Sequence, residues 1–327
     1  MDEVILSAFH GARCVVTGGT GLIGREVVRV LCGAGAQVTT VSLDDITADE
    51  RARHVRGDLC DFGFCKDVTR DAAFVFHLAG VKGSVEVTKA KPASFFVPLL
   101  MMNTNVLEAC RLNGVKKVVY TSSVGAYASG EVFRESEGHE GPPMDTFPGW
   151  AKRMAETQIE AYRIQYGLTN FAIVRPTNVY GPGDNFDPQN AMVIPSLMAR
   201  VRAGEDPLRV WGDGSAVRDF AYSTDIAEGV IVALHRGTRG RFVNLGGGEG
   251  VTIRELVETL ARVTPFRYEF DASKPSGFPR RVMDITLARE QLGWSPRTSL
   301  YEGLRKTWTW YDRNADEHLK RHNYFRN

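Results

Sequence analysis

Short apolar runs rich in β-branched residues alternate with helical patterns along the first half of the chain. Residues 13–17 (RCVVT) have the composition of a buried strand, and the apolar residues of 22–31 recur at helical spacing. The same reasoning predicts strands at 37–43, 72–79, 117–122 and 172–175, and helices near 99–112 and 151–166. Strands that alternate with helices pair in parallel through right-handed crossovers. The pattern therefore predicts an α/β fold with a Rossmann-type doubly wound parallel sheet.

The pattern loosens after Pro176, where glycine and proline become frequent. Thr252 and Glu255 have the spacing of a capping box at the start of a helix. Helices are expected at 193–202, 223–234, 252–263 and 300–312. We expect a large domain from residues 1–175 plus about 224–249, and a smaller α/β domain from residues 176–223 plus about 250–327.

Charge and composition exclude several classes of protein. Forty Lys and Arg against thirty-nine Asp and Glu give a net charge of +1, which excludes the broad positive field of a general nucleic-acid binder. The longest apolar stretches, such as 72–76 running into 78–81, fall short of the ~20 residues that span a bilayer. Because the start, Met1-Asp2-Glu3, is acidic and has no basic region followed by an apolar core, we expect no secretion signal. We therefore expect a soluble, cytoplasmic protein that binds neither nucleic acid nor membrane.

Five cysteines stand in the first third of the chain, and no two have CxxC spacing. We expect unreactive thiols in a reducing compartment, and no metal site. The basic and polar tail HLKRHNYFRN is expected to be a solvated end.

A glycine-rich segment connects the first strand to the first helix. Gly18, Gly21 and Gly24 have GxxGxxG spacing in the segment TGGTGLIG. The first glycine allows a tight turn, the second lets a pyrophosphate approach the backbone, and the third lets helix and strand pack closely. Together with Thr20, Leu22 and Ile23, these residues are predicted to bind a dinucleotide.

Acidic residues after the next two strands are candidates for the adenosine half. Asp44 and Asp45 follow the second strand and can accept hydrogen bonds from a ribose, which favours NAD over NADP. The acid that binds this ribose most often stands at the end of the second strand, which is closer to Ser42. NADP therefore remains an alternative cofactor. Asp58 and Leu59 follow a short strand and are predicted to lie at the adenine edge, although Asp58 also suits a plain turn.

Motifs along nearly the whole chain resemble extended short-chain dehydrogenases/reductases. In the first half these are TGGTGLIG, GDL at 57–59, HLAG at 77–80, TSS at 121–123 and Lys152. The second half is similar to the nucleotide-sugar branch, and most similar to GDP-fucose synthases, through PTNVYGPGDNF at 176–186, VIP at 193–195, VWGDGS at 210–215, RDF at 218–220, KPSGFPRR at 274–281 and LGW at 292–294.

The resemblance implies NAD(P) in the large domain and a nucleoside-diphosphate sugar, GDP-linked by preference, in the smaller one. It adds Leu78, Ala79, Gly80 and Lys152 to the cofactor contacts. It also implies a homodimer through the helices near 99–112 and 151–166.

The resemblance assigns catalytic roles to Ser123, which would hydrogen-bond the reacting sugar, and to Lys152, which would bind the nicotinamide ribose. The family tyrosine of YxxxK would stand at Pro148, which cannot ionise. Lys152 itself, a water held by Ser123, or another side chain from a loop must then move the proton. Tyr127 and Lys82 are two candidates, for each of which a structural role is the alternative.

This chain lacks the residues that two other reactions of the nucleotide-sugar branch require. The cysteine and histidine that GDP-fucose synthases use for epimerisation correspond to Gly125 and Met192, and the Asp-Glu pair of 4,6-dehydratases corresponds to Val124-Gly125. Because both reactions need positioned acids and bases, we exclude them in their usual form. The segment 131–147 is expected to be either a lid or a surface loop.

Substrate contacts are predicted from the second half. Arg218 in RDF matches the family's diphosphate-binding arginine, since a guanidinium donates two parallel hydrogen bonds to phosphate. Asn178 matches a residue that lines the pyrophosphate and sugar, and the other predicted substrate contacts are Lys82, Ser123, Val193 and Arg281. The sequence thus predicts an NAD-dependent oxidoreductase acting at C4 of a nucleotide-sugar, as a 4-dehydrogenase or a 4-epimerase. The alternative is a non-catalytic binding protein or partner subunit that has lost the tyrosine.

Overall fold

The computed structural model describes residues 1–81, 83, 85–187 and 190–322. Its centre is a seven-stranded parallel sheet with the strand order β12-β7-β5-β4-β1-β2-β3. The strands are β1 (Arg13–Thr17), β2 (Gln37–Ser42), β3 (Arg53–Arg56), β4 (Phe74–His77), β5 (Lys117–Thr121), β7 (Phe171–Pro176) and β12 (Phe242–Leu245). This arrangement confirms the predicted Rossmann-type sheet.

Burial within the sheet follows from its layers. All six residues of β7 are buried, whereas the edge strand β3 has none. Central parallel strands are covered by helices on both faces, so they must be apolar throughout. The chain passes from β1 to β2 and β3 in one direction and to β4 and β5 in the other, so right-handed crossovers place helices on opposite faces.

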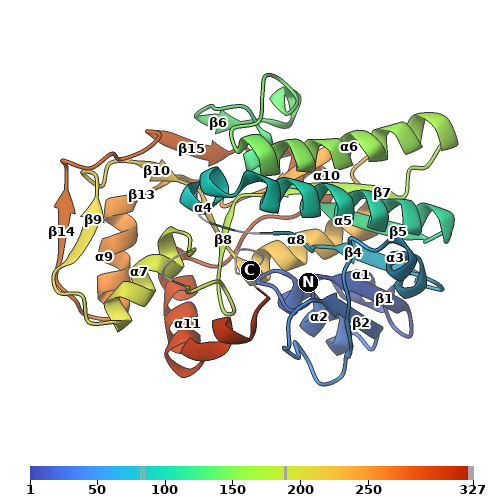
Figure 1. The fold of residues 1–327 in the computed structure, drawn as a ribbon, viewed down its shortest axis with the longest axis horizontal. Coiled ribbons are helices and arrows are strands. Elements are labelled where there is room, and N and C mark those ends of the chain that lie inside the picture. The colour runs from blue at the N-terminus through green and yellow to red at the C-terminus, as the bar shows by residue number, and fades with distance from the viewer. Residues whose placement is uncertain (82, 84, 188–189, 323–327) are drawn as a thin grey trace.

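The helices form two packed groups. On one side α2 (Gly24–Gly33) packs against α8 (Ser223–Arg236), and α10 (Thr286–Leu292) packs against α8 and β12. On the other side α3 (Phe62–Val68), α5 (Pro92–Leu112) and α6 (Thr146–Tyr166) pack together. Figure 1 shows α5 and α6 side by side. The remaining short helices of this part are α1 (Glu3–Ser7), α4 (Val85–Ala90) and the 3₁₀ turns η1 (Val124–Ala126) and η2 (Glu135–Glu137).

The length and composition of α5 correct one expectation from the sequence. This 21-residue helix is long and apolar enough to cross a membrane. The sequence analysis predicted only the part near 99–112, because Pro98 interrupts the pattern. In the structure α5 packs against α3, α6 and β4, and it buries Phe95, Leu99, Met102 and Val106. A core helix of a sheet protein has the same composition, so α5 does not by itself indicate a membrane span.

The second part of the molecule lies at the left of Figure 1. It holds a four-stranded sheet of β13 (Val251–Thr252), β10 (Val217–Arg218), β15 (Arg280–Met283) and β6 (Val132–Phe133), and two-stranded sheets of β8 (Asn178–Tyr180) with β11 (Phe220–Tyr222) and of β9 (Leu208–Trp211) with β14 (Tyr268–Asp271). Its helices are α7 (Val193–Arg202), α9 (Ile253–Val263), α11 (Leu300–Arg313) and η3 (Ala315–Lys320). The capping box predicted at Thr252 is present.

The segment 131–147 is anchored rather than free. Its strand β6 pairs in parallel with β15, and the Glu135 carboxylate accepts a hydrogen bond from the backbone amide of Asn244 at 2.9 Å. The second part has its own core around Leu197, Leu256 and Leu304. Residues 283–294, however, contribute Ile285 to the core of the main sheet. The domain boundaries given above stay a prediction.

Candidate functional site

A cleft of about 1630 Å³ extends from the glycine-rich turn after β1 to the second part of the molecule. Single-ligand pockets commonly measure about 300–1,000 Å³, so this cleft has room for two ligands. Most of the predicted site residues line it, namely Gly18, Thr20, Gly21, Leu22, Ile23, Gly24, Asp44, Leu59, Leu78, Ala79, Gly80, Ser123, Lys152, Asn178, Val193, Arg218 and Arg281.

The glycine-rich turn has the backbone geometry that its spacing predicts. Gly18 has a φ of +68°, and a Cβ there would lie 2.7 Å from the amide nitrogen of Ala79. A Cβ at Gly24 would lie 2.1 Å from the carbonyl oxygen of Gly18. Both positions therefore exclude any side chain. A Cβ at Gly21 would meet only the Gly18 carbonyl, at 3.2 Å, so Gly21 leaves open the wall that faces the cleft.

Asp44 is held at the end of β2 by two parts of the chain. The Thr20 hydroxyl donates to one carboxylate oxygen at 2.5 Å, and the backbone amide of His322 donates to the other at 2.8 Å. Asp58 behaves differently, because its carboxylate accepts from the amide of Cys60 at 2.8 Å and does not line the cleft. Asp58 therefore makes the contact of a turn residue, and its predicted place at the adenine edge stays a prediction.

The C-terminal tail corrects a second expectation. Arg321, which is half-buried, and His322, which is exposed, both line the cleft. The Arg321 guanidinium donates to the carbonyl of Gly183 at 2.5 Å and pairs with Glu317, which also pairs with Arg25 of α2 at 2.6 Å. These contacts fasten the tail beside the glycine-rich turn. The pair of Arg25 and Glu317 joins residues 292 positions apart, and the contact of Arg321 with Gly183 spans 138 positions. No local pattern in the sequence marks such contacts.

Ser123, two residues after β5, and Lys152 of α6 both line the cleft. Ser123 opens the turn η1, and its hydroxyl accepts a hydrogen bond from the amide of Gly125 at 3.1 Å. The Lys152 ammonium donates to the carbonyl of Thr121 at 2.7 Å, and it lies 3.8 Å from where a Cβ of Gly80 would stand. Burial lowers the pKa of Lys152 to about 8, against an opposing effect of Glu156.

A buried ion-pair network fixes this corner of the cleft. Glu156, one turn after Lys152, accepts two hydrogen bonds from Arg175 of β7, at 2.9 and 2.6 Å. It also accepts from the Ser122 hydroxyl at 2.5 Å and pairs with His139 at 2.8 Å. Burial acts to raise the pKa of Glu156, but these hydrogen bonds and the Arg175 charge bring it down to about 2.

Of the two side chains proposed to replace the family tyrosine, the structure describes only Tyr127. Tyr127 is buried against Phe133 and Phe242, and its hydroxyl donates to the Asn244 side chain at 2.8 Å. That is a structural role. Lys82 lies outside the described residues. Pro148 itself lines the cleft in the first turn of α6.

Two arginines stand side by side on the far wall. Arg218 of β10 and Arg281 of β15 are register partners on adjacent parallel strands, and both line the cleft. Arg218 donates to the carbonyl of Phe278 at 2.6 Å, and Arg281 lies over the Phe278 ring. Burial lowers the pKa of each arginine, and the charge of Arg281 lowers that of Arg218 further. The repulsion between two neighbouring guanidinium charges raises the free energy of the folded protein unless an anion lies close to both.

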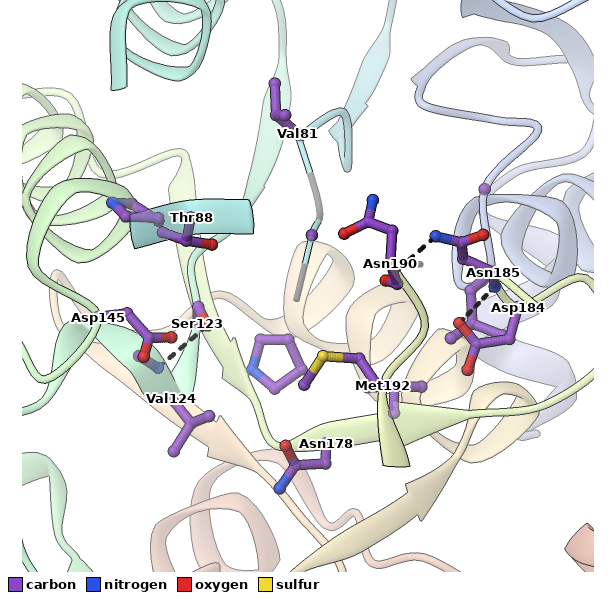
Figure 2. Close-up of a pocket in the computed structure, with 18 of the residues that line it drawn as sticks. Val81, Thr88, Ser123, Val124, Asp145, Asn178, Asp184, Asn185, Asn190 and Met192 are labelled. Atoms are coloured by element: carbon purple, nitrogen blue, oxygen red, sulfur yellow. Dashed lines mark hydrogen bonds between the residues drawn. The ribbon is translucent and has the colours of Figure 1, made fainter. Parts of the chain in front are cut away.

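Further features point to an anion at this wall. The Nε of Arg281 is buried and has no hydrogen-bond partner in the described part of the chain. Val193, the first residue of α7, also lines the cleft. The Asn178 carboxamide donates to the carbonyl of Asp219 at 3.0 Å, and Figure 2 shows it in the pocket near Met192.

Asp145 is a cleft residue that the sequence analysis missed. Figure 2 shows it on the same side as Ser123, with Asp184 and Asn185 on the opposite side. Its sequence context, in a Pro-containing segment ahead of a helix, is that of an ordinary cap. No group of three or more His, Cys, Asp or Glu side chains is placed to hold a metal ion among the described residues.

Comparison with protein families and known proteins gives a consistent result. The profile of the NAD dependent epimerase/dehydratase family matches residues 14–246. GDP-L-fucose synthase 1 of Arabidopsis thaliana is 33% identical over 324 residues, which cover 96% of this chain and 97% of that protein.

Solved structures are similar over the same length. An epimerase of Methanothermobacter thermautotrophicus has a TM-score of 0.87 at 26% identity, covering 97% of both chains. A UDP-glucose 4-epimerase of Thermotoga maritima, solved with UDP-glucose, has a TM-score of 0.80 at 28% identity and covers 93% of this chain and 99% of that one.

Proposed function

Because the chain belongs to the NAD dependent epimerase/dehydratase family, we propose that it is an oxidoreductase that moves a hydride at C4 of a nucleotide-sugar. The GDP-linked sugars are the favoured substrates, since the Arabidopsis relative is a GDP-L-fucose synthase. The net reaction is oxidation to a 4-keto sugar, or 4-epimerisation when the keto form is reduced again in the site.

The observation that carries this proposal is the continuity of the cleft. One end is a glycine-rich turn that excludes side chains at Gly18 and Gly24, as a pyrophosphate cradle requires. The other end is the arginine pair, with the unpartnered Nε of Arg281. Ser123 and Lys152 stand between these ends. A dinucleotide at the first end and a nucleoside-diphosphate sugar at the second would bring their reactive ends to this middle region.

At the dinucleotide end, a bound nicotinamide cofactor supplies a reversible hydride acceptor. The backbone of the glycine-rich turn binds its pyrophosphate, and the Asp44 carboxylate accepts from a ribose hydroxyl in place of one of its present partners. Lys152 binds the nicotinamide ribose. Its charge at neutral pH, below a pKa of about 8, also stabilises an alkoxide that develops nearby.

At the sugar end, Arg218 and Arg281 bind the diphosphate, which compensates the repulsion between them. The Ser123 hydroxyl orients the reacting sugar oxygen by a hydrogen bond. Gly125 and Met192 supply no acid or base for C3 or C5, so the proposed chemistry stays at C4.

A direct assay tests the function. Purified protein is loaded with NAD and mixed with GDP-, UDP-, CDP- and dTDP-hexoses, and the absorbance of the reduced nicotinamide is followed over a single turnover. We expect reduction with a GDP-hexose. Binding of both ligands without reduction, across the whole panel, would instead support the second candidate function, a non-catalytic binding protein, which Pro148 favours.

We also propose a homodimer and a cytoplasmic location. Apolar side chains exposed on neighbouring faces of α5 and α6 include Val97, Met101, Trp150 and Met154, each more than 40% exposed. Exposed apolar side chains that gather on two packed helices are typical of a protein–protein interface. A second copy of this chain would cover it.

A further inference from the structure

Hydride transfer from an alcohol releases a proton, and the residue at Pro148 cannot take it. A group that does so must be ionisable, must reach the cleft near Ser123, and must be free to accept. Tyr127 is buried, and the Lys152 ammonium already donates to Thr121. The carboxylate of Asp145 meets all three conditions.

The position of Asp145 follows from the helix that it precedes. Asp145 is the N-cap of α6, so residues 145, 148 and 152 follow at intervals of three and four and lie along one helix face. Asp145 therefore lies about one turn before Pro148, on the helix face that carries Lys152. Aspartate at an N-cap normally accepts a hydrogen bond from the helix amides, which contributes about 1 kcal/mol. Asp145 makes no such bond.

A glycine makes room for this carboxylate. A Cβ at Gly125 would lie 2.1 Å from Oδ2 of Asp145, so no side chain at 125 is compatible with the observed position. The backbone amide of Asp145 donates to the carbonyl of Gly125 at 3.2 Å. Because Gly125 also donates to the Ser123 hydroxyl, this bond holds Asp145 beside the turn that carries Ser123.

The electrostatic surroundings suit a proton acceptor. In the described part of the chain the Asp145 carboxylate has no hydrogen bond or ion pair. The charged group that faces it is Arg281 of β15, and Lys152 lies two turns further along α6. Burial in the cleft raises the pKa of Asp145 above its usual value, while Arg281 opposes the rise. Other cleft carboxylates stand elsewhere, with Asp44 at the glycine-rich turn and Asp184 across the cleft in Figure 2.

We propose that Asp145 is the catalytic acid/base of this chain, accepting the proton of the sugar C4 hydroxyl during oxidation and returning it during reduction. This proposal rests on the proposed function. In the forward step the C4–H bond breaks and its electron pair leaves with the hydrogen to the nicotinamide dinucleotide. The O–H bond breaks as well, its proton passes to the Asp145 carboxylate, and a C4 ketone forms.

The test compares Asp145→Asn with the wild type in the single-turnover assay. Asparagine keeps the shape of the side chain at the N-cap position of α6, but it cannot accept the proton. We expect a rate at least ~10²-fold lower, the low end for loss of a general base, with calorimetric affinities for NAD and the GDP-hexose within twofold of wild type. Glu137→Gln is the matched control, because Glu137 is an exposed carboxylate on the same segment. It should react at the wild-type rate.

Two further readouts separate proton transfer from a structural role. Added formate should restore part of the rate to Asp145→Ala and none to Lys152→Ala. The wild-type rate should rise with pH through the raised pKa of Asp145, and Asp145→Asn should lose this limb. A wild-type rate in Asp145→Asn would overturn the proposal and leave the C4 function standing. The proposal would also be overturned if Asp145→Asn kept the wild-type rate of hydride transfer but no longer exchanged a carbon-bound proton of the sugar with D₂O. No reduction in the wild type would overturn both.

Discussion

The buried pair of Glu156 and Arg175 should contribute strongly to stability, and Glu156→Gln tests this. Both side chains are almost fully buried, at 1% and 0% exposure. The variant removes the charge that neutralises the Arg175 guanidinium, which keeps the carbonyl of Gly138, the rings of Tyr127 and Phe242, and at most one acceptor oxygen of the glutamine. Breaking a buried pair in this way costs about 3–5 kcal/mol.

The pKa of Glu156 gives a second route to the magnitude. Its fall from the ordinary 4.5 to about 2 corresponds to about 3 kcal/mol, at ~1.4 kcal/mol per pKa unit. A depressed carboxyl pKa stabilises the fold above the unfolded pKa, and that stability is lost as pH falls toward the folded pKa. We therefore expect the variant to be about 3 kcal/mol less stable at pH 6, with a gap that narrows between pH 4.5 and 2.

Urea unfolding followed by tryptophan fluorescence measures this gap at each pH. Glu160→Gln is the matched control, because Glu160 lies one turn further along α6 in an exposed pair with Arg163 and should change stability by less than ~0.5 kcal/mol. A Glu156→Gln protein within 1 kcal/mol of wild type at pH 6, or a gap that does not depend on pH, would refute the reasoning.

Three other predictions concern binding and assembly. Gly21→Val should fold but lose NAD binding in a fluorescence titration, because the side chain blocks the cleft wall at the pyrophosphate cradle; wild-type affinity would place the cofactor elsewhere. Arg218→Ala should weaken GDP-hexose binding by about 1.5–3 kcal/mol, the range for a charge-assisted hydrogen bond, and leave NAD affinity intact in calorimetry. An Arg218→Ala protein that binds the GDP-hexose as tightly as the wild type does would contradict the assignment. Met154→Asp should sediment as a monomer, whereas Val4→Asp, on exposed α1, should sediment as the wild type does; a dimeric Met154→Asp would locate the interface elsewhere.

The sequence predicts elements well where one periodic pattern decides them. The observed bounds of β1 and α7 are the predicted ones, since each is bracketed by clear changes of pattern. The starts of α5 and α6 were missed by several residues. Pro98 and Pro148 resemble helix breakers, but Pro148 lies in the first turn of α6, where its missing amide hydrogen has no partner to lose.

The site was predictable only where a motif is local. The glycine-rich turn, Ser123 and Lys152 carry their signal in neighbouring residues. Asp145 carries none, because its place in the cleft depends on the missing side chain of Gly125, twenty residues earlier. The contact of His322 with Asp44 likewise joins the two ends of the chain. Such long-range contacts leave no periodic trace in a single sequence.

Deuterium transfer from C4 of the sugar tests the central claim most directly. A GDP-hexose carrying deuterium only at C4 is mixed with the NAD-loaded protein, and the dinucleotide is released and weighed by mass spectrometry. The account predicts reduced dinucleotide that carries one deuterium, formed more slowly than with unlabelled sugar. Reduced dinucleotide without deuterium would contradict it, and so would the formation of neither reduced dinucleotide nor C4-epimerised sugar while the GDP-hexose is bound.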